Sequence, residues 1–261
     1  MSTGPYQLQR LRTGLLPFRL HYFPRLQSTN DHAARLRRGD KLFAPAAVLA
    51  GRQTAGRGRG DNTWWSPPGC ITITFVVPTE ENLPAQELPL IAGLALRNAA
   101  AEVIGDDQSI QLKWPNDLLY RGRKLAGLLC ERINGIDLIG IGLNVNVNPA
   151  KAPKPLREII TSLSAITGQA KLDPTDVLIR VAGQLHRMLL RRREHSFAGF
   201  VAEYSRHHAL PGKRVTVIVP HEPAITGRCQ GIDDAGRLLV KSGRVLHRIV
   251  AGHVVLPTEA G

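Results

Sequence analysis

The stretch Gly51-Arg-Gln-Thr-Ala-Gly-Arg-Gly-Arg-Gly-Asp-Asn-Thr-Trp-Trp-Ser66 combines a permissive backbone, two cations and an aromatic pair in one loop. Its central glycines allow positive φ angles and bring amide N–H groups close to an anion, and its arginines supply fork-shaped donors that stay charged. The indole faces can pack against a flat ring. The sequence therefore predicts a site for an anionic ligand, formed by Gly56, Gly58, Gly60, Arg57, Arg59, Trp64 and Trp65.

Two apolar runs flank this loop. Residues Ala46–Gly51 and Cys70–Val77 are of strand length and rich in small or β-branched residues, which predicts two buried strands. A glycine–arginine stretch on its own is also typical of flexible basic surface loops and of disordered nucleic-acid-binding segments. The flanking strands favour a loop held on a rigid scaffold.

A second polar cluster follows in Lys113-Trp-Pro-Asn-Asp117 and Arg123-Lys-Leu-Ala-Gly127. Strands are expected at Ile110–Trp114 and Lys124–Ile133, with a turn between them, which together predict a β-hairpin. The alternative is ordinary turn capping by the amide and carboxylate, with the lysines at solvated strand ends. The side chains expected to converge at the base of the hairpin are Lys113, Lys124, Asn116 and Asp117.

A third run, Ile139-Gly-Ile-Gly-Leu-Asn-Val-Asn146, predicts a buried strand that ends in two asparagines. Its glycines permit the close approach of a ligand or of a neighbouring strand. The Asn144 amide is then expected to contact a polar group at the end of the strand.

The chain has 261 residues, of which 43% are hydrophobic, enough for one sizeable core and a small extra module. The cysteines, Cys70, Cys130 and Cys229, lack CxxC spacing, so we expect packing residues in a reducing compartment rather than a disulfide framework or a zinc site. No run approaches the ~18 apolar residues of a membrane span. We expect a cytoplasmic protein.

The formal net charge is +13, but the basic residues are dispersed along the chain. Residues 35–38 and 191–193 lie beside amphipathic helical patterns and are interpreted as solvated faces and basic ends of helices. A nucleic-acid groove is the less favoured alternative, and we expect no DNA binding. A basic surface would attract an acidic partner and raise its encounter rate.

The remaining patterns predict a scaffold of helices. The histidines near the last predicted helix have no partner at metal-ligand spacing and are interpreted as surface residues: His195, His207 and His208. Helices are expected at Asp31–Arg38 after the cap-like Ser28-Thr-Asn30, at Leu88–Ile104, from Asp173-Pro174 onward, and at Ser196–His208.

The pattern changes from Pro211 to short alternating strands separated by turn residues, which predict an SH3-like small barrel. The expected domains are therefore residues 1–210 and 211–261. The strands of the barrel are expected at Val215–Val219, Ala224–Asp233, Arg237–Lys241 and Val245–Val250.

Taken in order, these motifs resemble the biotin protein ligases, also called holocarboxylase synthetases, over nearly the whole chain. Some bacterial members carry an N-terminal DNA-binding domain, for which the lead before Ser28 is too short. Many bacterial members also repeat the basic loop element, whereas Gly60-Asp-Asn-Thr-Trp64 resembles the eukaryotic form. The motifs are Ser28-Thr-Asn30, Gln53, Gly56-Arg-Gly-Arg59, Lys113-Trp-Pro-Asn-Asp117, Arg123-Lys-Leu-Ala-Gly127, Gly140-Ile-Gly-Leu-Asn144 and the terminal β-module.

The resemblance implies an α+β fold: a mixed sheet flanked by helices, like that of class II aminoacyl-tRNA synthetases, followed by the SH3-like barrel. It implies activation of biotin with ATP to biotinyl-5′-AMP and transfer of the biotinyl group to a lysine of a biotin carboxyl carrier protein. ATP and Mg²⁺ are implied as co-substrate and ion, with no tightly bound cofactor. The identity of the acceptor, any regulatory role and the oligomeric state, a homodimer included, are left open.

The resemblance also implies roles for particular residues: Lys124 and Arg59 are catalytic, and Asp117 is a magnesium ligand. Neutral polar groups suit the uncharged ureido ring of biotin, and cations suit the meeting of a carboxylate with a triphosphate. The implied biotin-binding residues are Ser28, Thr29, Asn30, Gln53, Arg57, Gly58, Arg59, Lys124 and Gly127. The implied ATP- and adenylate-binding residues are Arg57, Arg59, Trp64, Lys113, Asn116 and Asn144.

Two alternative functions remain. A lipoate protein ligase resembles this fold and performs the same adenylation, but its Arg-Arg-x-Ser-Gly-Gly-Gly signature is absent from the chain. A noncatalytic basic nucleic-acid-binding protein would fit the charge, but it leaves Lys113-Trp-Pro-Asn-Asp117 unexplained.

Overall fold

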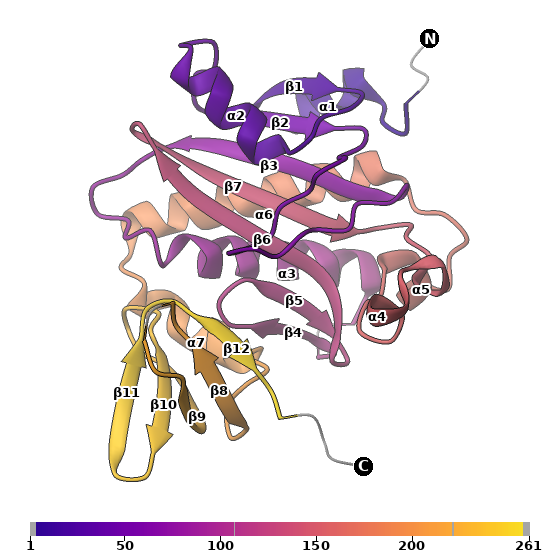
Figure 1. The fold of residues 1–261 in the computed structure, drawn as a ribbon. Helices are drawn as coiled ribbons and strands as arrows, with labels where there is room; N and C mark the ends of the chain where they lie inside the picture. The colour runs from indigo at the N-terminus through magenta and orange to yellow at the C-terminus, as the bar shows by residue number, and fades with distance from the viewer. Residues whose placement is uncertain (1–3, 107, 221, 258–261) are drawn as a thin grey trace.

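A seven-stranded mixed sheet forms the centre of the larger part of the molecule (Figure 1). The computed structural model describes residues 4–106, 108–220 and 222–257. The strand order is β1-β2-β3-β7-β6-β5-β4, and every neighbouring pair is antiparallel except β1 and β2. The strands are β1 (Arg19–Phe23), β2 (Ala46–Ala50), β3 (Cys70–Pro78), β4 (Ile110–Lys113), β5 (Asp117–Tyr120), β6 (Arg123–Ile133) and β7 (Ile136–Asn144).

Two long helices, α3 (Leu88–Ile104) and α6 (Pro174–Glu194), lie together behind the sheet, and the main core is packed between them and the strands (Figure 1). Helix α3 ends at Gly105, whose φ of 73° is the left-handed conformation that glycine adopts most readily. The Asp173 side chain caps α6 by accepting a hydrogen bond from the Thr175 N–H. Both predicted helices are thereby confirmed.

Of the shorter helices, α2 (Thr29–Arg38) lies on the other face of the sheet, whereas α1 (Leu8–Gly14) contacts α6 and α7 (Ala198–Arg206) contacts α3. Helix α2 contacts β2, β3 and β7, and Ser28 caps it by accepting a hydrogen bond from the Asp31 N–H, as the sequence predicted. The others are the 3₁₀ turn η1 (Pro149–Lys151), α4 (Lys154–Arg157) and α5 (Leu163–Thr167).

The predicted hairpin contains one more strand than the sequence indicated. Asp117 belongs to strand β5, which pairs with both β4 and β6, so the segment is a three-stranded meander with turns at residues 114–116 and 121–122. The tight second turn is made by Arg121 and Gly122, both with positive φ. Polar residues at both ends of a four-residue strand hid it within the turn.

His207 and His208 are buried, so the prediction that they are surface residues was wrong for both, whereas His195 is exposed. The cause is a backbone contact at the edge of the sheet. The Leu112 N–H donates to the His207 carbonyl, and the Ala209 N–H donates to the Leu112 carbonyl, which covers β4 with this segment. A buried edge strand cannot pair with another chain.

The basic end of α6 is also less solvated than predicted. Arg192 is largely buried and forms an ion pair with the buried carboxylate of Glu87, at 2.8 Å. Arg191 pairs with Glu203. These arginines fasten α6 to neighbouring segments in addition to complementing its dipole.

The C-terminal module is a five-stranded antiparallel sheet with the order β11-β10-β9-β8-β12. The predicted small β-module is present, but within the described residues the sheet does not close into a barrel, because no ladder joins β11 to β12. The three-residue strand β12 was not predicted. The strands are β8 (Arg214–Ile218), β9 (Ile225–Ile232), β10 (Leu238–Ser242), β11 (Val245–Ile249) and β12 (His253–Val255).

The cysteines are free, and two of them, Cys70 and Cys229, are buried as predicted for packing residues. Cys130 is partly exposed. Within the described part of the chain, no helix is both long enough and apolar enough to cross a membrane.

Candidate active site

Glycines in the central strands leave a shallow floor on the face of the sheet opposite α3 and α6. Gly142 of β7 pairs with Gly127 of β6, which pairs with Asp117 of β5, which pairs with Lys113 of β4. Cross-strand partners point to the same face of a sheet. The Lys113 and Asp117 side chains therefore rise beside a strip of sheet that carries no side chain.

Trp64 lies on this strip. A Cβ atom added to Gly142 would lie 2.3 Å from Cε2 of Trp64, and one added to Gly127 would lie 3.1 Å from Cζ3. Only glycine leaves room for the indole at the first of these positions. The Lys124 Nζ atom is 5.6 Å from the centre of the Trp64 ring, within the range of a cation–π contact.

Lys124 reaches this face because of a β-bulge. Asp117 pairs with Gly127, but Leu119 pairs with Lys124, so Leu125 is an extra residue in β6. Without the bulge, residues 124 and 127 would point to opposite faces. With it, the Lys124 Nζ atom lies 2.6 Å from Oδ1 of Asp117.

The predicted neutral biotin-binding residues form one buried network at the start of α2. Gln53 Oε1 accepts hydrogen bonds from Thr29, both from its N–H at 2.7 Å and from its hydroxyl at 3.0 Å. Asn30 lies over Gly140, where an added Cβ would be 2.3 Å from Oδ1 of Asn30. Ser28 is buried beside them. Thr74 of β3 completes the network by donating to Asn30 Oδ1 at 2.6 Å.

Arg57 is held by two carboxylates that the sequence analysis did not single out. Its guanidinium forms ion pairs with Asp31 of α2 and with Glu131 of β6, the latter at 2.8 Å. Hydrogen bonding to Glu131 is the main cause that raises the pKa of Arg57. Glu131 also accepts from the Asn30 amide at 2.7 Å, which connects Arg57 to the neutral network.

Arg59 is oriented differently. Its Nη1 donates to the main-chain carbonyl of Gly252, in the C-terminal module, at 3.1 Å. Burial lowers the pKa of this guanidinium, while the negative charge of Asp117 raises it. Gly58, between the two arginines, donates its N–H to the Asn62 carbonyl at 2.7 Å and fixes the turn of the loop.

The other predicted residues line the same end of the sheet. Burial lowers the pKa of Lys113 against the opposing charge of Asp117. Asn116 donates to the Leu128 carbonyl at 2.9 Å, and buried Asn144 donates to the Thr161 carbonyl at 3.0 Å. These two hydrogen bonds brace the ends of the strands.

Further residues of the site come from parts of the chain that lack a recognisable motif. Asp31 stands in the first turn of a helix, and Glu131 interrupts an apolar strand, which was the one visible signal. Thr74 and Gly252 carry no signal in the sequence, because their role depends on neighbours 44 and 193 residues away.

No group of three or more His, Cys, Asp or Glu side chains in the described residues could hold a metal ion by itself. A magnesium ion that arrives with a nucleotide needs only one or two carboxylates, the rest of its ligands being phosphate and water. Asp117 is the carboxylate that lies beside the cations of Lys113 and Lys124. A single carboxylate of this kind fits an ion that arrives with a nucleotide.

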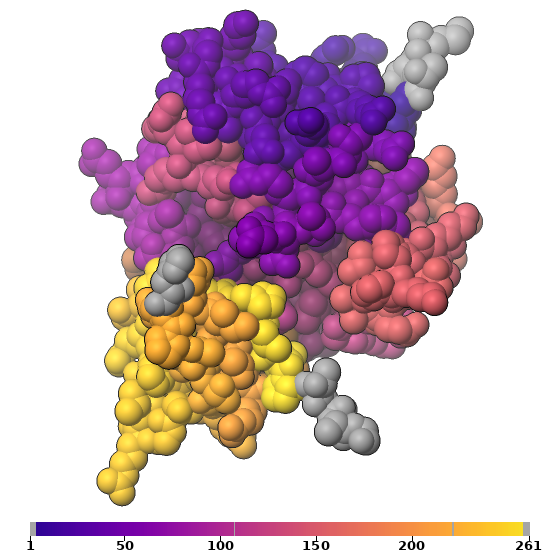
Figure 2. All heavy atoms as spheres, viewed as in Figure 1, coloured from indigo at the N-terminus to yellow at the C-terminus, as the bar shows by residue number. Residues whose placement is uncertain are grey.

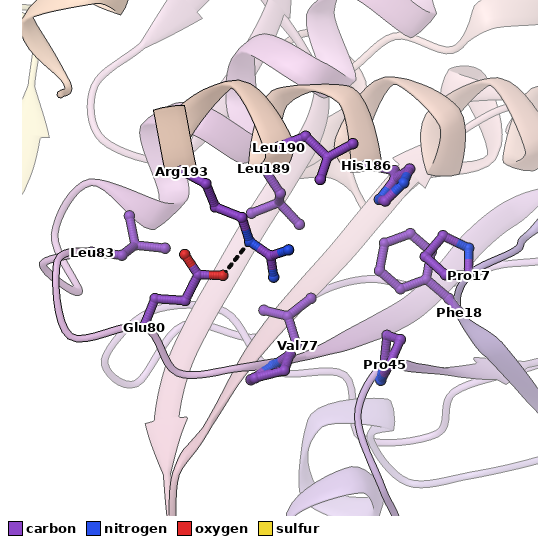
Figure 3. A pocket seen from close by; sticks show the side chains of 11 residues that line it. Pro17, Phe18, Pro45, Val77, Glu80, Leu83, His186, Leu189, Leu190 and Arg193 are labelled. Atoms are coloured by element: carbon purple, nitrogen blue, oxygen red, sulfur yellow. Dashed lines mark hydrogen bonds and ion pairs between the residues drawn. The ribbon is translucent and has the colours of Figure 1, made fainter. Parts of the chain in front are cut away.

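A separate cavity of about 280 Å³ lies between α6 and the far ends of β1, β2 and β3 (Figure 3). It is mainly apolar, and Arg193 and Glu80 form an ion pair at its edge. No predicted site residue lines it. The candidate active site is thus the open glycine floor and not this cavity.

Comparisons with known proteins agree with this fold and site. Residues 22–148 match the Biotin/lipoate A/B protein ligase family, and residues 212–256 match the Biotin protein ligase C terminal domain. The chain is 34% identical to a biotin–[acetyl-CoA-carboxylase] ligase of Mycobacterium tuberculosis, covering 87% of this chain and 85% of that protein. It is 32% identical to the ligase of the same name from Paracoccus denitrificans, covering 89% and 95%.

A solved structure, the biotin protein ligase from Aquifex aeolicus in complex with biotin and ATP, superposes with a TM-score of 0.79 at 30% identity. The alignment covers 91% of this chain and 97% of that one. Fold and site together define an enzyme of the ligase class. The chain belongs to the biotin protein ligase family.

Proposed function

We propose that this ligase activates biotin with ATP to biotinyl-5′-AMP and transfers the biotinyl group to a lysine of a biotin carboxyl carrier protein. The observation that carries the proposal is a buried neutral network lying beside a row of cations on one face of the sheet. The ureido ring of biotin is neutral, whereas its carboxylate and the ATP phosphates are anions. The network is Ser28, Thr29, Asn30 and Gln53, and the cations are Arg57, Arg59, Lys113 and Lys124.

In the first step, a carboxylate oxygen of biotin attacks the α-phosphorus, and the bond to pyrophosphate breaks. Two anions must approach each other closely, so fixed positive charge at the reacting centre lowers the barrier. Lys124 and Arg59 supply this charge, while Trp64 on the glycine floor offers a surface for the nucleotide. Mg²⁺ bound with ATP would shield the phosphates further, with Asp117 as its protein ligand.

In the second step, the amine of the acceptor lysine attacks the carbonyl carbon of the mixed anhydride. The bond to AMP breaks, an amide forms, and the amine releases its proton. AMP leaves as a stable phosphate anion, so the main need is a cation near the departing oxygen. We assign that role to Lys124, because it stands on the floor beside Trp64.

The chain's net charge of +13 supports an acidic acceptor, because opposite charges speed the encounter of two proteins. Lipoate is the alternative substrate, since the matched family includes lipoate ligases. The match of residues 212–256 to a biotin ligase C-terminal domain favours biotin.

The test is exchange of labelled pyrophosphate into ATP in the presence of biotin, lipoate or neither. Exchange should depend on biotin, because labelled pyrophosphate enters ATP only by attacking an adenylate that the ligand has formed, which releases the ligand again. Exchange driven by lipoate instead would replace the proposed substrate. Exchange without any ligand would contradict the proposal. The absence of exchange under all three conditions would contradict it as well.

A further inference from the structure

The two arginines of the glycine-rich loop, Arg57 and Arg59, have different interaction partners. Arg57 forms ion pairs with the carboxylates of Asp31 and Glu131. Arg59, in contrast, forms no ion pair with a carboxylate within the described residues, and it donates a hydrogen bond to the neutral carbonyl of Gly252. A carbonyl orients a guanidinium without cancelling its charge. Arg59 therefore remains available for an anionic ligand.

Gly252 is fixed by the C-terminal module. It is buried at the turn that leads into β12, and β12 pairs with β8 through His253 and Ile218. A Cβ added to Gly252 would lie 2.6 Å from Cγ1 of Val217 and 3.2 Å from the Ile218 carbonyl oxygen. The turn therefore lies against β8, and its carbonyl has a defined position.

The two segments come from opposite ends of the chain. Figure 2 shows the yellow C-terminal module in contact with the purple N-terminal part of the molecule, and the Arg59–Gly252 bond is one contact between them. Trp114, buried next to the Lys113 cation, makes a second contact by donating to the Gly236 carbonyl at 3.0 Å. The module thus contacts the larger part of the molecule at two points, and the Arg59–Gly252 bond is the one that lies at the site.

We infer that the Gly252 carbonyl is a positioning group for Arg59, so that the C-terminal module determines how long the adenylate is retained. The inference rests on the proposed function, because retention has meaning only if an adenylate forms. Arg59 pointed into the site holds the phosphate of the adenylate, and a displaced turn lets the side chain swing toward solvent. The reactive intermediate then escapes before an acceptor lysine arrives.

The test compares Gly252→Ala with the unaltered protein. The added methyl group would push the turn away from Val217, so the dissociation rate of biotinyl-AMP should rise about tenfold or more, the usual effect of losing one hydrogen bond to a charged group. The rate of adenylate formation should fall by a smaller factor. Equal changes in both rates, or no change in release, would overturn the inference.

Two variants separate positioning from general loosening of the module. Val217→Ala alone opens the module's core without displacing the turn, and it should leave release near the normal rate. Val217→Ala combined with Gly252→Ala makes room for the new methyl group, and it should restore retention. If Val217→Ala alone releases the adenylate as fast as Gly252→Ala, the module acts through its stability and the inference is wrong.

A double-mutant cycle with Arg59→Ala gives the decisive comparison. Without the guanidinium, Gly252→Ala should add little to the release rate. An undiminished effect in that background would contradict the inference.

If Gly252→Ala fails to fold, amide exchange in the unaltered protein decides instead. Biotinyl-AMP should protect residues 57–63 and 250–253 together, and protection of the loop alone would contradict the inference. Absence of biotin-dependent pyrophosphate exchange in the unaltered protein would instead contradict the proposed function itself, and the inference with it.

Discussion

The Nζ atom of Lys124 and Oδ1 of Asp117 lie 2.6 Å apart, and a β-bulge at Leu125 makes this contact possible. Bulges are common next to active sites because they re-aim a side chain. Here the bulge turns a lysine from one face of the sheet to the other, onto the glycine floor. The carboxylate of Asp117 holds the ammonium there.

Lys124→Ala should slow both half-reactions by about a hundredfold or more, as expected when a donor aimed at developing charge is removed. Lys124→Arg should restore little, because a planar fork does not replace a compact ammonium 2.6 Å from a carboxylate. Single-turnover formation of biotinyl-AMP, followed by transfer to a carrier domain, measures both steps. Near-normal rates in a Lys124→Ala variant with a normal melting temperature would show that Lys124 is only a solvated residue at the end of a strand.

Arg59→Gly should loosen retention of the adenylate by about 1.5 to 3 kcal/mol, the usual contribution of a charge-assisted hydrogen bond. Biotinylation of bystander proteins should then increase, because free biotinyl-AMP reacts with any lysine it meets. The readout is the lifetime of the bound intermediate together with labelling of an unrelated protein. A variant that labels only its carrier, with an unchanged lifetime, would show that Arg59 does not retain the adenylate.

The two glycines of β7 should affect different substrates. Gly142→Ala would displace Trp64 and should raise KM for ATP, whereas Gly140→Ala would displace Asn30 and should raise KM for biotin. Each change should be at least about tenfold, equivalent to ~1.4 kcal/mol. Gly183→Ala in α6, where the nearest atom would be 3.9 Å away, is the matched control and should change neither. A common effect of both β7 variants on both substrates would argue against separate subsites.

Burial lowers the pKa of His208 to about 3, and neither ring nitrogen has a hydrogen-bond partner within the described residues. Because the unfolded chain binds this proton near pH 6.5 and the folded protein does not, stability is lost as the pH falls below 6.5. The loss between pH 7 and pH 5 should be about 2 kcal/mol. Denaturant unfolding should show no such loss of stability for His208→Leu. The control His195→Leu, which replaces an exposed histidine, should retain the loss. If the stability of His208→Leu has the same pH dependence as that of the unaltered protein, His208 is not the cause of the loss.

The fold was predicted where local patterns decide it. The apolar runs at Cys70–Val77 and Leu88–Ile104 correspond to β3 and α3, because an element that is buried nearly all round leaves a continuous apolar run in the sequence. Strand β5 was missed because it has only four residues, and its polar ends are typical of a turn. The burial of His207 and His208 depends on pairing with Leu112, nearly a hundred residues earlier, which no local pattern reveals.

Which residues gather at the site was easier to predict than how they are arranged. Motifs indicated which cations and amides would gather, and the structure brings Lys113, Asp117 and Lys124 to one face. The bulge at Leu125 and the support of Arg59 by Gly252 are properties of strand register and module packing. Such tertiary relationships leave no recognisable pattern of residue spacing in the sequence.

The most direct test of the account is ATP-dependent transfer of biotin to one lysine of a carrier domain, followed by mass spectrometry of the intact acceptor. The account predicts a single biotinyl addition that requires ATP, this protein and the acceptor lysine, and that disappears when that lysine is replaced by arginine. Lipoyl addition in its place, or no ATP-dependent modification by a correctly folded protein, would contradict it.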